Sequence, residues 1–474
     1  MDTIQIDRGS DVSIQQQLYE RLRGAIIEGG VRSGERLPST RSLAAQLNIA
    51  RGTVDRVYVR LADEGWVVAR GQRGTVVSPE LQQGRSRVRT RKHEPAPAAS
   101  ARLHSFDGPV LPFRFGLPAL DLFPRKVWAR LAARQARNFS ASQLFYPDPI
   151  GLPALREALT TYLAVSRGIA CRPEQVIVTT GYQAALNLVA NLLLQRGDRV
   201  WLEDPGYGYT QDALRALSMR IEPIPVDAQG LCVDYGRAHH PQASLAVVTP
   251  THQFPMGCSM SLSRRQALLA WAEERDARVL EDDYDCEFHY SGHRPPALKS
   301  IDGADRVFYA GSFSKSLFPG LRLGYLVLPL RFVEPVARIC RSLHRGAAVH
   351  EQSVVAAFMS EGHFARHLRK MRNQYRLRRQ ALVDALNQRF GSAIEISLEA
   401  GGLHILARFP GAGPDVELAA KALKHGLMPY PLSAQSIEHD AGQGLLMSFT
   451  NIAERDAAGV AATLHRAITQ AAAS

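Results

Sequence analysis

The chain has 474 residues, of which 45% are hydrophobic and 22% charged, and its formal net charge is +12. This length exceeds that of one ordinary domain, and the composition excludes a disordered or fibrous protein. Charged residues interrupt the first 30 positions, and no apolar run reaches the ~18 residues of a membrane span, so neither a signal peptide nor a membrane anchor is predicted. The five cysteines are widely spaced without a C-x-x-C pair, which favours reduced thiols in the cytoplasm and indicates no metal site.

Positive charge is concentrated near the N-terminus. Residues 1–95 hold 16 Lys and Arg against 11 Asp and Glu. Such an excess attracts polyanions such as nucleic acid, although a solvated basic face has the same composition.

The first 78 residues are predicted to form a winged helix-turn-helix. Apolar residues recur at helical spacing from Ile14 to Ile27, until two glycines end the pattern. A short second helix containing Leu43 and a third helix over residues 51–64 are joined by only three residues, as in a helix-turn-helix. Residues 66–77 then alternate around a glycine-rich tip, which predicts a small hairpin or wing.

Basic side chains gather at one end of these helices. Arg51 and Thr53 begin the third helix and Arg41 begins the second, so all three are predicted to face a DNA major groove and its phosphates. Arg73, at the wing tip, is predicted to reach the adjacent backbone or minor groove. The alternative is a winged-helix module for protein contacts in which these arginines are merely solvated.

This region resembles the GntR superfamily of bacterial regulators. The resemblance rests on GERLPSTRSLA at residues 34–44, ARGTV at residues 50–54 and LADEGW at residues 61–66. It implies the following candidate DNA contacts: Ser39, Thr40, Arg41, Arg51, Thr53, Arg73 and Gly74.

Residues 79–110 change in character and are predicted to form a flexible linker. Five Arg or Lys residues lie between positions 85 and 92, and a Pro/Ala-rich run follows. The basic residues either add non-specific DNA affinity that salt weakens or belong to a solvated tether.

From residue 111 onward, short apolar strands alternate with helical segments, which predicts a mostly parallel sheet covered on both faces. The predicted strands cover residues 176–180, 199–203, 245–250, 278–282, 307–310 and 325–328. We expect a large domain over about residues 111–335 and a small one over 336–474. Ligands of such sheets bind at the carboxyl ends of the strands.

One stretch, GSFSKSLFPGLRLGY at residues 311–325, has the composition of a pyridoxal phosphate (PLP) site. Lys315 lies between hydroxyl residues and Arg322 follows behind a Pro-Gly turn. A lysine forms the Schiff base with PLP, while hydroxyls, backbone N–H groups and an arginine hold its phosphate. The alternative is a turn with a surface lysine.

Three polar motifs precede this lysine, each after a predicted strand. Gly181 opens a helix whose free N–H groups suit an anion, and Tyr207 can place its ring against the pyridine. Asp282 and Tyr284 supply a carboxylate for the pyridine nitrogen and a phenol for the ring hydroxyl. Taken singly, such acidic clusters are more often metal ligands or surface turns.

The order of these motifs resembles the fold-type I aminotransferases over about residues 113–470. The resemblance implies Lys315 as the Schiff-base residue, Asp282 on the pyridine nitrogen, Tyr284 on the ring hydroxyl, Tyr207 stacked on the ring, and Gly181, Tyr182, Gln183, Ser312, Ser314 and Arg322 around the phosphate. It also implies a homodimer in which Tyr146 reaches the phosphate of the neighbouring subunit.

Three departures from that family bear on catalysis. The usual ring-hydroxyl amide is missing, and His252 or Gln253 is its candidate substitute. The short spacing before Tyr284 leaves both Asp282 and Asp283 as partners of the pyridine nitrogen. Residues 446–449 read Leu-Met-Ser-Phe where aminotransferases often have Arg-Leu-Ser-Phe, so the arginine that holds a substrate carboxylate is absent.

A further basic run, residues 366–379, is interpreted as a solvated helix face. A second DNA-facing surface and an interdomain contact are the alternatives.

The two halves together resemble the MocR regulators. The resemblance implies a domain-swapped, head-to-tail homodimer that binds promoter DNA through two winged helices. Our hypothesis is that PLP on Lys315 is the sensor: an amine effector, or PLP itself, changes the aldimine and shifts the populations of domain arrangements without full turnover. The alternatives are an active aminotransferase with an appended DNA-binding head and a DNA-binding scaffold without cofactor.

Overall fold

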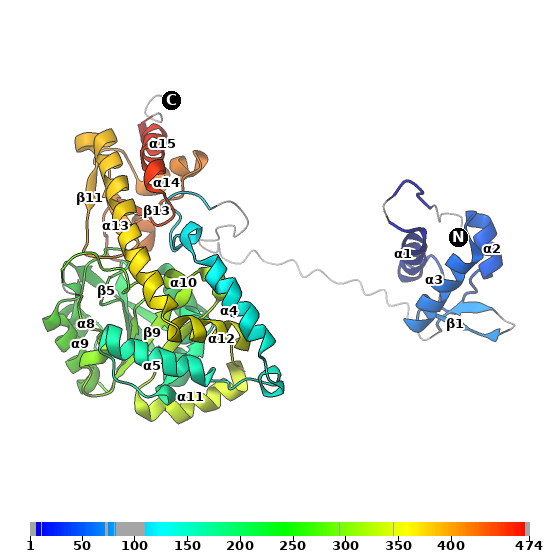
Figure 1. The fold of residues 1–474 in the computed structure, drawn as a ribbon, viewed down its shortest axis with the longest axis horizontal. Coiled ribbons are helices and arrows are strands. Elements are labelled where there is room, and N and C mark those ends of the chain that lie inside the picture. Colours follow the sequence, from blue (N-terminus) through cyan, green and yellow to red (C-terminus); the bar gives the residue numbers. More distant parts are fainter. Residues whose placement is uncertain are drawn as a thin grey trace. The chain divides into compact units, whose positions relative to one another are not determined.

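The computed structural model describes residues 6–10, 12–71, 74–79, 81, 110–292, 294–344 and 346–469. The chain divides into two compact units, residues 1–106 and 107–474 (Figure 1). Most of the predicted linker lies outside the described residues, and its bounds stay a prediction. Among the described helices, none is both long and apolar enough to cross a membrane.

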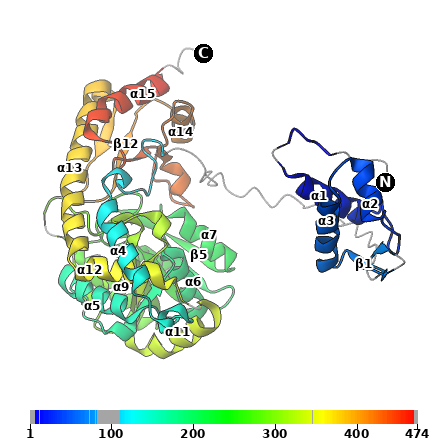
Figure 2. The same ribbon diagram turned by 45° about the vertical axis from the view of Figure 1, so that its right-hand side comes forward.

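The N-terminal unit is the predicted winged helix-turn-helix. Its elements are α1 (Ile14–Ile27), α2 (Thr40–Leu47), α3 (Arg51–Asp63), β1 (Val67–Ala69) and β2 (Thr75–Val77). The three helices bury one apolar core that includes Leu18, Leu22 and Val57, with the β1–β2 hairpin beside them (Figure 2). Asn48 ends α2 in the left-handed conformation, at φ 51°, which allows the chain to turn into α3 within three residues.

The C-terminal unit is built on a sheet of eight strands. They are β3 (Val176–Thr179), β4 (Arg199–Asp204), β5 (Arg220–Asp227), β6 (Gly230–Leu231), β7 (Leu245–Val248), β8 (Arg278–Asp282), β9 (Val307–Ser312) and β10 (Gly324–Val327), in the order β3-β10-β9-β8-β7-β4-β5-β6. The run from β9 to β5 is parallel, whereas β10 and β6 are antiparallel to their neighbours. All six predicted strands are present. Strands β5 and β6 were missed: Pro223 and Pro225 weaken the strand pattern of β5, as is typical near a sheet edge, and β6 has only two residues.

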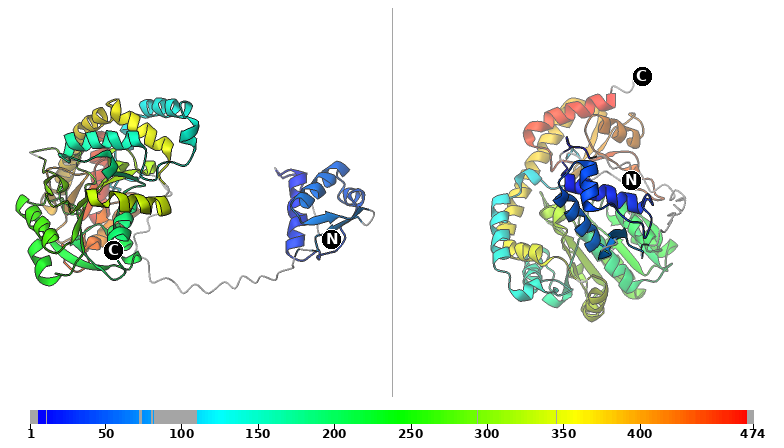
Figure 3. Two further views of the ribbon diagram at one scale, coloured as in Figure 1. Left: turned by 90° about the horizontal axis from the view of Figure 1, so that it is seen from below. Right: turned by 90° about the vertical axis from the view of Figure 1, so that its right-hand side faces the viewer.

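Helices cover both faces of this sheet. They are α4 (Arg125–Arg137), α5 (Pro153–Arg167), α6 (Tyr182–Leu193), α7 (Gly208–Ala216), α8 (Val233–His239), α9 (Leu262–Glu274), the short α10 (Phe313–Ser316), α11 (Val333–Ile339) and α12 (Val349–Ser360). Adjacent strand residues enter different cores: Leu280 packs with Phe308 on one face, and Val279 with Trp271 on the other. Helix α4 packs on α12, seen as neighbouring cyan and yellow helices in Figure 3.

The rest of the chain forms a smaller α/β layer. Its elements are α13 (His363–Phe390), β11 (Glu395–Ser397), β12 (His404–Arg408), α14 (Asp415–Lys424), β13 (Tyr430–Pro431), β14 (Leu445–Ser448) and α15 (Ala457–Thr469). The four strands are antiparallel in the order β11-β12-β14-β13. Helices α13, α14 and α15 pack together over them, as Figure 2 shows. No part of this second sheet was predicted individually.

The sheet topology brings distant motifs to one edge. Strands β4, β7, β8 and β9 are parallel, so their carboxyl ends lie on the same side. Thr179 at the end of β3 and Ser312 at the end of β9 both pair with Gly324 of β10. Segments that follow these five strands therefore converge there.

One close approach in this sheet generates a test of the packing. A Cβ placed on Gly311 would lie 2.2 Å from Cζ of the buried Tyr325, its cross-strand partner. We expect Gly311→Ala to destabilise the unit by about 1–3 kcal/mol through overpacking. The matched control is Gly459→Ala at an exposed position of α15, where an added Cβ meets no atom within 4 Å and helix propensity favours alanine. Urea denaturation measures both, and equal stability of the two variants would contradict the packing.

Candidate functional site

Lys315 lies on α10, directly after β9, and its side chain turns inward. Its Nζ donates a hydrogen bond to the Gly116 carbonyl at 2.8 Å and lies 5.8 Å from the centre of the Phe115 ring. Burial lowers the pKa of Lys315 to about 8, against the opposing effect of Asp285 and Asp282. More of this amine is neutral near pH 7 than for an exposed lysine, which makes it a better nucleophile.

Gly116 is a site residue that sequence reasoning missed. Its φ is +83°, and a Cβ would lie only 2.6 Å from Nζ of Lys315. The backbone conformation therefore favours glycine, and a larger residue would also displace the lysine amine from its present position. The one sequence signal for this position was that Gly116 lies two residues before Pro118, as in a turn.

Asp282 ends β8 with a buried carboxylate oxygen, Oδ1, that has no hydrogen-bond partner among the described residues. Burial, followed by the neighbouring Asp283 and Asp285, raises the pKa of Asp282 well above its usual value. A buried acceptor without a partner indicates a missing donor, and a protonated pyridine nitrogen is such a donor.

Asp283 is already engaged. Its Oδ2 lies 2.7 Å from Nε of Arg167 and accepts a hydrogen bond from the Tyr309 hydroxyl at 2.6 Å. Its Oδ1, like Oδ1 of Asp282, has no hydrogen-bond partner among the described residues. Asp282, and not Asp283, acts on the pKa of Lys315, which favours Asp282 as the candidate partner of the pyridine nitrogen.

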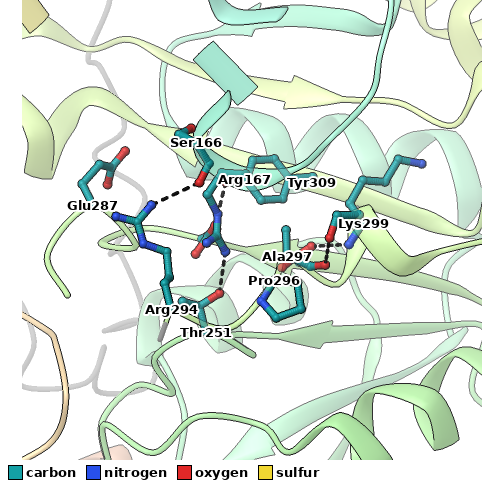
Figure 4. Close-up of polar contacts among 12 residues, drawn as sticks. Ser166, Arg167, Thr251, Glu287, Arg294, Pro296, Ala297, Lys299 and Tyr309 are labelled. Carbon is teal, nitrogen blue, oxygen red and sulfur yellow. Dashed lines mark hydrogen bonds and ion pairs between the residues drawn. The ribbon is translucent and has the colours of Figure 1, made fainter. Parts of the chain in front are cut away.

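Arg167 ties several parts of the site together from the end of α5 (Figure 4). Beyond its ion pair with Asp283, its Nη2 donates to the Thr251 hydroxyl at 2.8 Å and its Nη1 to the Pro295 carbonyl at 3.3 Å. The side chain is 1% exposed, so these contacts are shielded from water. Arg167 thereby joins the end of β8 to the loop after β7, and no local pattern in the sequence identifies it.

Tyr284 contacts His252. The tyrosine hydroxyl lies 3.1 Å from Nδ1 of His252, which also lies 3.1 Å from a carboxylate oxygen of Asp285. Burial opposes the imidazolium, but Asp285 outweighs it and raises the pKa of His252. Gln253 instead donates its amide hydrogens to the carbonyls of Pro205 and Phe254, so His252 is the better placed substitute for the missing amide.

Tyr207 and the start of α6 lie at the same edge. Tyr207 packs edge-on against Phe254, with 5.5 Å between ring centres. Gly181 begins α6 without a side-chain cap, at φ 118°, and leaves backbone N–H groups for an anion. The Tyr182 hydroxyl bonds Thr210 at 2.9 Å, whereas the buried Nε2 of Gln183 has no partner within the described chain.

The other predicted phosphate residues follow β9. Ser312 caps α10, its hydroxyl accepting from the Ser314 N–H at 3.1 Å. Arg322 is exposed in the left-handed conformation, at φ 52°. The amine, the orphaned carboxylate oxygen and this group of donors together fit PLP.

Two further positions compared with the aminotransferases are Leu446, a departure, and Tyr146, a match. Leu446, where the carboxylate arginine is expected, is fully buried with Phe254, Leu406 and Leu432. Tyr146 is 74% exposed and follows Phe145, which is 72% exposed.

In the N-terminal unit, Arg51 begins α3 with its side chain 67% exposed, 3.6 Å from Asp55. Ser39 caps α2 by accepting from the Ser42 N–H at 3.1 Å. The other predicted DNA contacts are the exposed Arg41 and the half-buried Thr40, Thr53 and Gly74. Gly74 has φ +79° and lies against the Arg36 guanidinium; Arg73 lies outside the described residues.

The basic run on α13 has two kinds of residue. Arg378 is buried and pairs with Asp121, and Arg379 donates to the Glu399 carbonyl at 2.7 Å. The exposed members are Arg366, Arg369, Lys370 and Arg376. Part of the run therefore holds the unit together and part is solvated.

The Arg167–Asp283 pair generates a stability prediction. Arg167→Met leaves a buried carboxylate unpaired, and we expect a loss of about 3 kcal/mol. Replacing both partners, as Arg167→Met with Asp283→Asn, is expected to regain about 1 kcal/mol or more. Urea denaturation of the two single variants and the double variant measures the coupling. Strictly additive losses would show that the two side chains do not depend on each other.

Two family models match the chain. The model for aminotransferase class I and II matches residues 119–429, and the model for bacterial regulatory proteins of the gntR family matches residues 14–77.

Similar solved structures are aminotransferases. The kynurenine aminotransferase of Pyrococcus horikoshii, in complex with PMP, has a TM-score of 0.70 at 26% identity, covering 78% of this chain and 93% of that one. LysN, the α-aminoadipate aminotransferase of Thermus thermophilus, complexed with N-(5'-phosphopyridoxyl)-L-leucine, has a TM-score of 0.70 at 28% identity, covering 77% and 93%. The predicted fold-type I aminotransferase-like architecture is confirmed.

Relatives match both units together. The chain is 36% identical to the "Probable rhizopine catabolism regulatory protein MocR" of Rhizobium meliloti, over 94% of this chain and 92% of the relative. It is 34% identical to the HTH-type transcriptional regulator TauR of Rhodobacter capsulatus, over 89% and 90%. These matches run along most of the chain, so the protein belongs to the MocR-type regulators, which join a gntR-family winged helix-turn-helix to an aminotransferase class I and II domain.

Proposed function

We propose that this protein is a PLP-binding transcription regulator that senses an amine effector, or PLP itself, at Lys315. The observation that carries the proposal is the inward-turned Lys315 amine near a buried Asp282 oxygen without a partner, in a chain that also has a GntR-type domain.

PLP, when bound, would supply an aldehyde that can react with the lysine amine or with the amine of an effector. Asp282 would hold a proton on the pyridine nitrogen, Tyr284 would orient the ring hydroxyl, and Tyr207 would pack against the ring. The phosphate would be held by the backbone N–H groups of Gly181, Tyr182 and Gln183 at the start of α6, together with Ser312, Ser314 and Arg322. The depressed pKa of Lys315, about 8, keeps part of its amine ready for exchange at physiological pH.

In the N-terminal unit, α3 is the recognition helix. Arg51 and Thr53 approach base edges, and Arg41 with the capped start of α2 holds the phosphates. Ser39, Thr40, Arg73 and Gly74 complete the proposed surface. Binding to promoter DNA in this way places the protein in the cytoplasm.

A homodimer is part of the proposal. Tyr146 lies in a run of three large apolar residues that are each more than 70% exposed, and such runs are typical of an interface. A head-to-tail arrangement in which Tyr146 completes the partner's phosphate site would present two heads to two half-sites.

We favour a sensor over an active aminotransferase. The relatives that cover most of this chain are named as regulators, and Leu446 supplies no cation for a substrate carboxylate. A partial, single-step transamination remains compatible with the retained lysine, aspartate and tyrosine. The sensor acts by shifting the populations of domain arrangements and hence the spacing of the heads.

Lys315→Ala is the direct test of cofactor binding. We expect wild type to develop a visible absorbance band when titrated with PLP, and the variant to show only the spectrum of free PLP. The matched control is Lys370→Ala, which removes an exposed lysine of α13 and is expected to behave as wild type. A band of wild-type intensity in Lys315→Ala would refute the assignment.

Arg51→Ala tests the DNA-binding head. On an operator selected from a library of random duplexes, we expect this change to weaken binding about tenfold or more and to leave PLP binding intact. Arg21→Ala removes an equal charge from an exposed position of α1 and is expected to lower affinity only slightly. Equal effects of the two changes, measured by fluorescence anisotropy, would mean that Arg51 contributes charge alone.

A further inference from the structure

Two buried aspartates hold one loop of the small layer. The loop covers residues 432–444, between β13 and β14. Asp204 and Asp415 are both 0% exposed, and each accepts hydrogen bonds from backbone N–H groups of this loop. Hydrogen bonds to an ionised carboxylate are stronger than those between neutral groups, so both contacts restrain the loop.

The two aspartates lie in different layers. Asp415 begins α14 of the small layer and accepts from the N–H groups of Ser433 at 2.9 Å and Gly444 at 3.0 Å. It therefore closes the loop within the loop's own layer. Asp204 is the last residue of β4 in the large sheet. Of the two carboxylates, the one of Asp204 thus joins the loop to the other layer.

Asp204 accepts from three successive backbone amides of the loop. Its Oδ1 accepts from the N–H of Ile437 at 2.7 Å, and its Oδ2 accepts from the N–H groups of Glu438 and His439, each at 2.8 Å. The side chain of Ile437 also packs against a core of the large sheet. Displacing this part of the loop would leave a buried carboxylate without these three donors, which is costly.

The same part of the loop contacts the turn that carries Tyr207. The N–H of Gly206 donates to the Gln435 carbonyl at 3.1 Å, one residue before Tyr207. Residues 435–439, which we call the clamped loop, are therefore bonded to the turn both through the Asp204 side chain and through the backbone.

Tyr207 belongs to the candidate site. Phe254 links its ring to that of Phe115, with ring centres 5.5 Å and 4.9 Å apart, and the Phe115 ring lies 5.8 Å from Nζ of Lys315. Burial raises the pKa of Tyr207, and the charge of Asp282 raises it further. A displacement of the turn would therefore move a side chain of the site.

We propose that Asp204 is a positioning residue that couples Tyr207 to the clamped loop, so that PLP packed against Tyr207 and the ordered loop stabilise each other. This inference rests on the proposed function, because it presumes that PLP binds at Lys315. The loop reaches the surface at Glu438, which is exposed. By linkage, occupation of a buried site then changes the order of a surface segment.

Hydrogen exchange of the full-length protein tests the coupling directly. Peptides that contain the three amides bonded to Asp204 are followed by mass spectrometry, without PLP and with PLP. We expect PLP to slow the exchange of these amides about fivefold or more, because it stabilises the ordered loop. Peptides from α15 are the internal reference and are expected to exchange equally in both states.

Asp204→Asn and Asp415→Asn are the matched pair of variants. Each replaces a buried carboxylate that accepts from the same loop, but Asp204→Asn alone of the two weakens the contact with the large sheet. We expect Asp204→Asn to weaken PLP binding about fivefold or more and to remove the effect of PLP on exchange. Asp415→Asn is expected to bind PLP as wild type does.

A double-mutant cycle with Tyr207→Leu asks whether Asp204 acts through the tyrosine. The absorbance band that depends on Lys315 reports PLP affinity in each variant. If the effect of Asp204 passes through Tyr207, we expect Asp204→Asn to lower PLP affinity much less in the Tyr207→Leu background than in wild type. A loss of equal size in both backgrounds would overturn the inference.

Unchanged exchange of the three amides in wild type, although the band shows that PLP is bound, would also overturn the inference. This measurement decides even if a variant does not fold. A failure of the proposed function gives a different result, since the wild-type protein would then show no Lys315-dependent band with PLP.

Discussion

The ion pair between Arg167 and Asp283 is the constraint on which the geometry of the candidate site depends. Both side chains are 1% exposed, so neither charge has access to water and each requires the other. The pair fixes the turn after β8: Oδ2 of Asp283 is held by Arg167 and Tyr309, whereas Asp282 makes neither contact and acts on the pKa of Lys315. Without this anchor, either carboxylate could approach a cofactor.

The same arginine reaches Thr251, next to His252, which contacts Tyr284. One buried cation thus links the ends of two adjacent strands. The close fit of Gly116 against the Lys315 amine constrains the opposite side. Arg167 and Gly116 therefore position the reactive side chains of the site without taking part in the proposed chemistry, as is expected where a reactive group needs fixed neighbours.

The sequence alone predicted the elements with strong local signals. The three helices of the head and the six apolar strands follow from periodicity, and Lys315, Asp282 and Tyr207 follow strands in the expected order. Gly116 and Arg167 could not be found in this way. Gly116 contacts Lys315 and Arg167 pairs with Asp283, and each partner lies at least 116 positions away in the sequence. Strands β5 and β6 and the small sheet were missed because prolines and very short strands leave little periodicity.

The central claim is that the aminotransferase-like unit and the DNA-binding head are coupled, and linkage offers its most direct test. Operator affinity is measured for the protein alone, with PLP, and with PLP plus an amine that shifts its spectrum, and ligand affinity is then measured with and without operator. If the two units are coupled, the ligand changes operator affinity by the same factor by which the operator changes ligand affinity. We expect this factor to be about fivefold or more. Identical operator affinity in all three states would contradict the account.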